Sequence, residues 1–205
     1  MILEQGHIYH IYNQGNNRQK IFFNRDNYQF FLKKIGEHIL PFADILAWCL
    51  MPNHFHLMIY VVDSEGFTSS EALTSRTESE DFTTTDKTLN DSIGVLLRYY
   101  TRAVNIQQKR TGSLFREGTK AVELGSIESE KLKYQKRNAN IAGIAQNLDE
   151  EQLQTCFGYI HKNPVKAGLA KQITDWEFSS ACDITQIRKG SLINKKLIEE
   201  LGLHL

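Results

Sequence analysis

Residues 47–62 read AWCLMPNHFHLMIYVV, and this stretch decides the fold that we expect. Apolar, β-prone residues lie on both sides of a short connection over residues 51–53. The stretch therefore predicts an antiparallel pair of strands over residues 43–50 and 54–62. The second of these strands would lie at the centre of a sheet, and it carries two histidines.

His54 and His56 are two residues apart on this strand. Because successive side chains of an extended strand point to opposite faces, both imidazoles would share one face, about 7 Å apart at a rise of ~3.3 Å per residue. At that spacing they could converge on one metal ion. The two histidines could also have a structural role, with their ring nitrogens hydrogen-bonded in the core or at a sheet edge.

A second polar group lies far along the chain, where residues 157–169 read FGYIHKNPVKAGL. Tyr159 and Asn163 are four apart and would lie on one face of a helix, which Pro164 should end or kink just after Asn163. Mg²⁺ and Mn²⁺ take oxygen and imidazole ligands and keep positions open for phosphate oxygens. Two histidines, an asparagine carbonyl and a tyrosine hydroxyl therefore predict a phosphoryl-transfer site. Taken alone, a tyrosine in the position of Tyr159 is more often a packing residue. An asparagine in the position of Asn163 is more often a turn former or a helix cap.

The remaining patterns complete a regular order of elements. We expect a strand over residues 7–12, a helix capped by Asp26 and closed by Pro41, the strand pair, a helix capped by Ser92, a strand-like segment over 113–124 and a tyrosine helix over 149–163. This β-α-β-β-α-β order followed by a helix is the ferredoxin-like, split βαβ pattern of the α+β class. Its antiparallel sheet would have helices packed on one face, and the C-terminal helix could lay the tyrosine across the face that bears the histidines.

Length and composition fit one globular domain with insertions, because the chain has 205 residues, 41% of them hydrophobic and 23% charged. We expect a single domain over residues 1–182, with an acidic Ser/Thr-rich insertion at 63–91 and a polar basic insertion at 126–148. A C-terminal tail over residues 183–205 could cover a sheet edge or complete an interface.

The chain contains no run of about 18 apolar residues, and its first residues lack the basic and apolar regions of a secretory signal. Cys49, Cys156 and Cys182 are odd in number and have no paired spacing, which is typical of reduced thiols. We therefore expect a cytoplasmic protein with no membrane partner.

The formal net charge of zero is the sum of two opposed regions. Residues 63–91 contain eight acidic and two basic residues, whereas residues 98–137 contain ten basic and four acidic ones. Only the basic region suits a phosphate backbone. The same stretch could also be a solvated helix face with ordinary basic residues.

Taken in order, these motifs resemble those of one family. The His54-Phe55-His56 triplet is similar to the His-hydrophobic-His motif of HUH endonucleases. Residues 159–165 resemble the catalytic-tyrosine segment of single-tyrosine transposases, in particular the REP-associated tyrosine transposases. Further stretches that resemble the family, in the family's order, are residues 9–18, 110–115 and 175–180.

The resemblance implies a metal-dependent transposase of mobile elements that nicks and rejoins single-stranded DNA next to a small hairpin. It assigns the nucleophile to Tyr159, which would form a 5′-phosphotyrosine, and the ligands of Mg²⁺ or Mn²⁺ to His54, His56 and Asn163. The residues that we expect to contact DNA are polar residues of the first loop and basic residues on and after the second helix, namely Asn13, Asn17, Arg18, Arg98, Arg102, Lys109, Arg110, Arg116 and Lys120.

Two departures from the family pattern concern DNA binding. Gln14 stands where an arginine is common, and residues 117–119 stand where basic and aromatic residues are usual. Two alternatives stay open, a domesticated DNA-binding relative with little turnover and an RNA-binding module of the same fold. A monomer and a homodimer both fit the resemblance, since relatives in the wider superfamily dimerise and sometimes exchange the tyrosine helix.

Overall fold

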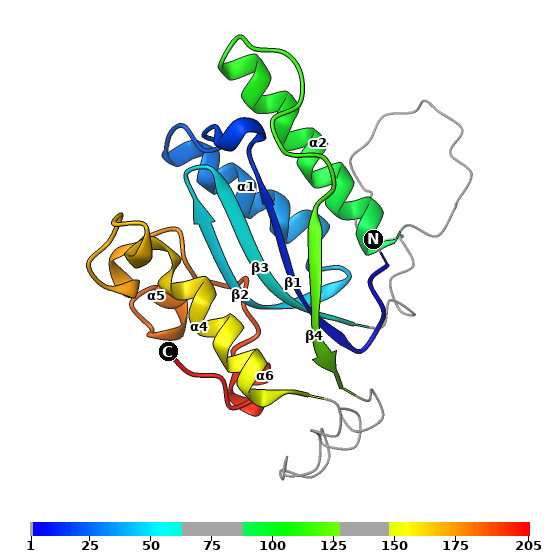
Figure 1. The fold of residues 1–205 in the computed structure, drawn as a ribbon, viewed down its shortest axis with the longest axis vertical. Coiled ribbons are helices and arrows are strands. Elements are labelled where there is room, and N and C mark those ends of the chain that lie inside the picture. Colours follow the sequence, from blue (N-terminus) through cyan, green and yellow to red (C-terminus); the bar gives the residue numbers. More distant parts are fainter. Residues whose placement is uncertain (1, 63–87, 128–147) are drawn as a thin grey trace.

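The computed structural model describes residues 2–62, 88–127 and 148–205, and its centre is a four-stranded antiparallel sheet (Figure 1). The strands lie in the order β2-β3-β1-β4. Their bounds are His7–Gln14 for β1, Ala43–Met51 for β2, His54–Val61 for β3 and Lys120–Ser126 for β4. The predicted pair of strands is confirmed, with only residues 52 and 53 between them.

Helices cover both faces of this sheet. α1 (Arg25–His38) and α2 (Leu89–Gln107) pack against each other on one face, and α4 (Glu150–Lys166) crosses the other (Figure 1). The ferredoxin-like α+β fold is thus confirmed, with the tyrosine helix added to the second face. The short elements are η1 (Asn16–Arg18), η2 (Ile173–Asp175), α5 (Ala181–Ile184) and α6 (Lys195–Glu200).

The side chains of β3 show how the two faces differ. Phe55 points toward α1 and α2, where its ring centroid lies 5.2 Å from that of Phe31 and 6.0 Å from that of Phe115. Because strand neighbours face opposite ways, His54 and His56 point toward α4. One face of the sheet therefore packs an aromatic core, and the other carries histidines.

Two helices begin differently from the prediction. α1 is capped by Asn24 rather than Asp26, because the Asn24 side chain accepts a hydrogen bond from the first turn and Asp26 lies within that turn. α2 begins behind a capping box made by Thr88 and Asp91, which leaves Ser92 buried inside the helix. In each helix an upstream side-chain oxygen already accepts from one N–H group of the first turn, so the predicted cap is not needed.

Two predicted boundaries are also wrong. α4 does not end at Asn163 but continues for three residues with Pro164 inside it. The helix tolerates the missing N–H because Pro164 lies in the last turn, where Ala167 still donates to the Asn163 carbonyl at 3.0 Å. The strand expected over 113–124 is shorter, since β4 begins only after Gly118, whose φ of +70° interrupts an extended backbone.

The C-terminal segment covers the edge of the sheet beside β2. Ile193 forms a parallel bridge with Ile45, and the Asn194 N–H donates to the Ile45 carbonyl at 2.9 Å. Leu197 and Ile198 of α6 are buried in the same core as the sheet. Of the two roles considered for the tail, the structure shows the covering of an edge. The domain boundary that we placed at residue 182 falls inside α5.

Most of the two expected insertions, at 63–91 and 126–148, lies outside the described residues. Of the helices within the described ranges, none is both long and apolar enough to cross a membrane.

Phe31 joins α1 to α2 and to the sheet. Its side chain is fully buried, and its ring centroid lies 4.8 Å from that of Tyr100. We expect Phe31→Ala to lower the free energy of unfolding by about 3–5 kcal/mol, because the substitution removes buried surface and leaves a cavity. Urea unfolding followed by circular dichroism measures the loss. Phe23→Ala, which truncates a ring that is 41% exposed, is the matched control. Equal losses in both variants would contradict this assignment of the core.

Candidate active site

Three histidines from two neighbouring strands gather on the sheet face beneath α4. The register pairs Tyr12 of β1 with His56 of β3, which brings His10 close to His56 as well. The ring centroids of His54 and His56 lie 5.0 Å apart, and those of His10 and His56 also lie 5.0 Å apart. The expectation that His54 and His56 share one face of a strand is confirmed, and His10 joins them.

α4 places Tyr159 against this cluster. Its ring centroid lies 5.4 Å from that of His56 and 6.1 Å from that of His10, in edge-on contacts. The side chain stays 39% exposed, so a polymer in solution can reach it. Nζ of Lys166 lies 5.4 Å from the centroid of the Tyr159 ring. A phenol, imidazoles and an ammonium group therefore meet in one accessible place.

Asn163 lies one helical turn after Tyr159 on the same face of α4. Its amide nitrogen donates to the Tyr159 carbonyl oxygen at 3.0 Å. Burial lowers the pKa of His54, and a hydrogen bond with the Asn163 side chain partly offsets that effect. The fold thus brings Tyr159 and Asn163 to His54 and His56, about 100 positions away in the sequence.

The neighbours of His54 determine which of its ring nitrogens carries the proton. The Asn53 amide nitrogen donates to the Arg18 carbonyl at 3.3 Å, and the Asn53 amide oxygen lies 2.6 Å from Nδ1 of His54. Because an amide oxygen only accepts hydrogen bonds, Nδ1 is the protonated nitrogen of His54. Its Nε2 then has a lone pair for a ligand.

The two ring nitrogens of His56 have different surroundings. Its Nδ1 lies 2.9 Å from Nε2 of His10, whereas its own Nε2 is buried and has no hydrogen-bond partner among the described residues. Burial, with His10 and His54 nearby, lowers the pKa of His56 to about 2, and burial lowers the pKa of His10 to about 4. Both rings are therefore neutral at neutral pH. Buried polar atoms normally have a partner, so this nitrogen is a candidate ligand atom.

The donor set fits a divalent metal ion. Within the described ranges, no group of three or more His, Cys, Asp or Glu side chains is arranged to hold a metal. A third protein ligand beside His54 and His56 would therefore have to be of another type, such as the amide oxygen of Asn163. Imidazole nitrogens and an amide oxygen are both ligands of divalent metal ions, so these three residues fit such an ion, and its identity as Mg²⁺ or Mn²⁺ stays a prediction.

His10 is a member of the histidine cluster that the sequence analysis did not name as a site residue. A metal bound at Nε2 of His56 requires the proton on Nδ1, and that proton would be donated to Nε2 of His10. The signal in the sequence is the alternation of His10 and Tyr12, which places both side chains on one face of β1. The contact of His10 with His56 depends on the pairing of β1 with β3. The sequence of either strand alone does not predict that pairing.

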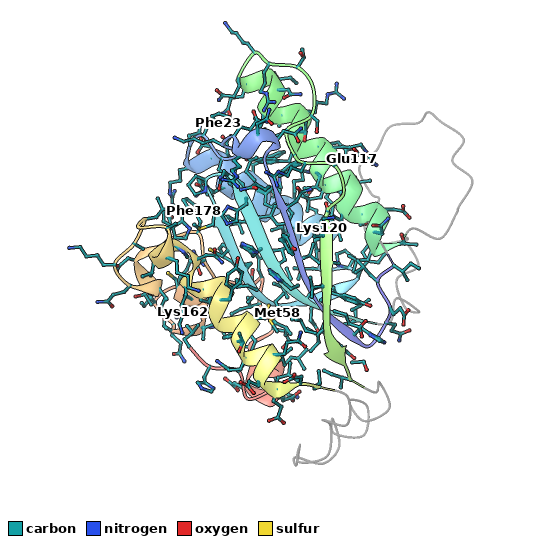
Figure 2. All side chains as sticks on the ribbon, viewed as in Figure 1. Phe23, Met58, Glu117, Lys120, Lys162 and Phe178 are labelled. Atoms are coloured by element: carbon teal, nitrogen blue, oxygen red, sulfur yellow. The ribbon has the colours of Figure 1, made fainter. Side chains whose placement is uncertain are left out.

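An open pocket of about 360 Å³ lies in front of the histidines. Its lining combines the candidate catalytic residues with polar and charged residues of β1 and of the segment before β4. The lining residues are Tyr12, Asn13, Gln14, His54, His56, Arg116, Glu117, Gly118, Lys120 and Tyr159. Glu117 and Lys120 lie near the start of β4 (Figure 2), so the pocket holds a carboxylate as well as cations.

Five of the predicted DNA-binding residues line pockets through basic side chains. Arg116 and Lys120 line the pocket in front of the histidines. Arg98, Arg102 and Arg110 line a second cleft, beside α2, which Arg116 also borders. The structure therefore divides the predicted basic surface between two adjoining hollows.

The four other predicted DNA-binding residues have different surroundings. Asn13 is buried at the end of β1, lines both hollows and donates through its amide nitrogen to two acceptors within residues 116–119, at 3.1 and 3.2 Å. Asn17 and Arg18 are exposed in η1, with φ of 51° and 57°. Lys109 is exposed beyond the end of α2. Contact of these residues with DNA stays a prediction.

Other polar and aromatic residues near α4 have structural partners. The Trp176 indole N–H donates to the Leu50 carbonyl at 2.9 Å, and Phe178 stacks on Tyr28 with ring centroids 3.8 Å apart. His161 is fully buried, and each of its ring nitrogens has a hydrogen-bond partner at 2.8 Å. These side chains hold the C-terminal segment and α4 to the sheet.

We expect His10→Leu to weaken Mn²⁺ binding by about 10–100-fold, because the acceptor for the His56 proton is lost. His10→Gln keeps an acceptor at a similar reach and should bind Mn²⁺ more tightly than His10→Leu. Isothermal titration calorimetry measures both affinities without DNA. His7→Leu, which removes a histidine bonded to Glu123, is the control. An unchanged affinity in a folded His10→Leu variant would refute the positioning role of His10.

Comparison with solved structures shows the fold. A structure of a REP-associated tyrosine transposase bound to a REP hairpin is similar to this chain, with a TM-score of 0.56 and 17% sequence identity. The likeness covers 95% of this chain and 92% of that one. No protein-family model matches the chain, and no curated protein is similar to it in sequence. At this identity, the comparison shows a common architecture in which a sheet is covered by helices.

Proposed function

We propose that this protein is a transposase-like enzyme that cuts and rejoins single-stranded DNA next to hairpins, with Tyr159 as the nucleophile. The observation that carries the proposal is the contact of the exposed Tyr159 ring with His56, whose buried Nε2 has no hydrogen-bond partner within the part of the chain that the structure describes. A hydroxyl nucleophile beside an imidazole with a free lone pair suits metal-assisted phosphoryl transfer.

The proposed reaction moves a DNA strand onto the protein and back. The Tyr159 oxygen attacks a backbone phosphorus and loses its proton to solvent. The bond from phosphorus to the 3′ oxygen breaks, and that oxygen takes up a proton. The products are a 5′-phosphotyrosine and a free 3′-hydroxyl. Because the phosphotyrosine keeps the energy of the phosphodiester bond, a 3′-hydroxyl can attack it and restore a strand without ATP.

His54, His56 and Asn163 are the residues that would hold Mg²⁺ or Mn²⁺. The bound ion would polarise the scissile phosphate and offset its charge. The contact of His54 with Asn53 favours the tautomer that leaves Nε2 of His54 with a lone pair, and the contact of His56 with His10 is compatible with the same tautomer in His56.

The choice of single-stranded DNA rests on shape and charge. The pocket in front of Tyr159 is open, so a flexible chain can bring a phosphate to the hydroxyl, and Arg116 and Lys120 offer contacts to its neighbours. The hairpin in the proposal is supported by the solved structure with the same fold, which is bound to a REP hairpin. In this reading the hairpin positions the strand and the pocket receives the phosphate.

The RNA-binding alternative is less well supported. An RNA-recognition module of this fold stacks bases on an open sheet face. Here α4 crosses that face, and Tyr159 packs edge-on against His56. A domesticated DNA-binding relative would keep the same surfaces, so only a measurement of cleavage separates it from an active enzyme.

We expect Tyr159→Phe to abolish the covalent protein–DNA adduct and to keep single-stranded DNA binding within about 1 kcal/mol of the wild type. The substitution removes the attacking oxygen and keeps the ring that packs on His56. Incubation with labelled hairpin-bearing single strands and Mn²⁺, followed by denaturing electrophoresis, measures the adduct.

The matched control is Tyr12→Phe, because Tyr12 is a second tyrosine of the same pocket and its ring centroid lies 5.8 Å from that of His56. This variant should form the adduct. If Tyr159→Phe forms it and Tyr12→Phe does not, Tyr12 is the nucleophile and the assignment is wrong.

We expect His54→Ala and His56→Ala each to abolish metal-dependent cleavage, because each removes one imidazole from a site with three protein ligands. Asn163→Ala should retain more activity, since water can partly replace a neutral amide oxygen. Cleavage rates over a Mn²⁺ titration measure the effects, and His204→Ala, at an exposed histidine near the C-terminus, is the control. Full cleavage by either histidine variant would rule out this set of ligands.

A further inference from the structure

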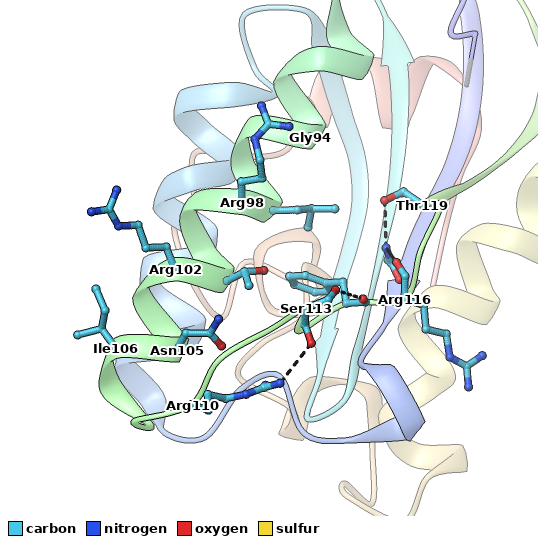
Figure 3. A pocket seen from close by; sticks show the side chains of 14 residues that line it. Gly94, Arg98, Arg102, Asn105, Ile106, Arg110, Ser113, Arg116 and Thr119 are labelled. Carbon is cyan, nitrogen blue, oxygen red and sulfur yellow. Dashed lines mark hydrogen bonds between the residues drawn. The ribbon is translucent and has the colours of Figure 1, made fainter.

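A cleft of about 810 Å³ lies beside the candidate active site, between α2 and the segment before β4 (Figure 3). Its lining includes polar and basic side chains as well as Leu97, Ile106 and Phe115. Arg98 and Arg102 are exposed and lie one turn apart on α2, about 6 Å along the helix axis at 1.5 Å per residue. The cleft is therefore an open hollow with cations along α2.

The charge of this cleft is unbalanced. Among the residues that the structure describes, it is lined by Arg98, Arg102, Arg110 and Arg116 and by no acidic side chain. Within the part of the chain that the structure describes, none of these four arginines forms an ion pair. Four guanidinium groups without carboxylate partners favour an anionic ligand.

Two buried polar atoms of residues that line the cleft also have no hydrogen-bond partner among the described residues. Arg110 donates through Nη2 to the Ser113 carbonyl at 3.2 Å, but its Nη1 is buried and has no hydrogen-bond partner. Asn105 donates to the Gly112 carbonyl at 2.9 Å, and its amide oxygen is likewise buried without a partner. A donor and an acceptor are thus held in place at the cleft and are not used within the protein.

The cleft adjoins the pocket in front of Tyr159. Asn13, Arg116 and Gly118 line both hollows. Figure 3 shows Arg98 and Arg102 on α2, whereas the guanidinium of Arg116 extends to the other side of the segment before β4. A chain leaving the pocket could therefore pass Arg116 and continue along α2.

We propose that this cleft binds the phosphate backbone of a DNA strand whose neighbouring phosphate lies at Tyr159. This inference rests on the proposed function and adds a binding site to it. An extended polyanion fits the cleft better than a mononucleotide does, because a small ligand is normally enclosed on most of its surface. Contacts from Arg98 and Arg102 to different phosphates would hold the strand without reading its sequence.

The test measures binding separately from cleavage. Two fluorescein-labelled single strands are titrated with protein in the presence of a chelator. One has about 30 nucleotides, which is longer than a usual binding site, and the other has about 6, which is within the usual range of site sizes. In the double variant Arg98→Gln, Arg102→Gln, affinity for the long strand should fall about tenfold or more. The slope of log affinity against log salt should become shallower by about 1.4, at about 0.7 for each lost contact. Affinity for the short strand should fall by a smaller factor, because a strand of this length cannot fill the pocket and the cleft together.

The matched control is Lys189→Gln, Lys195→Gln, which removes two positive charges from the C-terminal segment and should bind both strands like the wild type. Unchanged long-strand affinity in the arginine variant, or an equal loss in the lysine variant, would overturn the inference. Tighter binding of RNA than of DNA of the same sequence would also overturn it. Neither metal nor cleavage enters this measurement, so a missing covalent adduct would refute the proposed function and leave the cleft as a DNA-binding site.

Discussion

The alternation of side chains along β3 is the constraint on which the rest of the structure depends. Phe55 packs among the rings of Phe31 and Phe115 on the face of α1 and α2. Since neighbours on a strand face opposite ways, this packing turns His54 and His56 toward α4. A slip of one residue in register would bury both imidazoles in the aromatic core and expose Phe55 to α4. The hydrophobic core therefore sets the position of the candidate active site.

The face beneath α4 is buried and polar at once, which costs stability. His10 and His56 are only 8% and 4% exposed, and burial of a polar ring is unfavourable unless it is hydrogen-bonded. Their mutual hydrogen bond satisfies one nitrogen of each ring, and Nε2 of His56 has no hydrogen-bond partner in the described ranges. An unsatisfied buried atom is expected where a ligand completes the structure. In this view the two neutral rings are held ready for a ligand at some cost to the isolated fold.

Some charged side chains of the protein are paired with each other, and others are left for a ligand. Arg25 pairs with Glu177 and joins α1 to the C-terminal segment, whereas the pair of Arg188 with Asp183 lies within that segment. The arginines beside α2 have no such partners within the described ranges. A protein with a formal net charge of zero can thus present a strongly cationic surface, because opposite charges are separated along its sequence.

Local patterns in the sequence determined the order of strands and helices, the shared face of His54 and His56 and the helical spacing of Tyr159 and Asn163, because these features depend on residues a few positions apart. The same patterns misplaced helix caps and the effect of Pro164, where several nearby residues compete for one role. Only the tertiary structure decided that α4 crosses the histidine-bearing face and that His10 contacts His56. The physical reason is that His10 and His56 are 46 positions apart and meet through the pairing of β1 with β3, which the burial of the whole sheet selects.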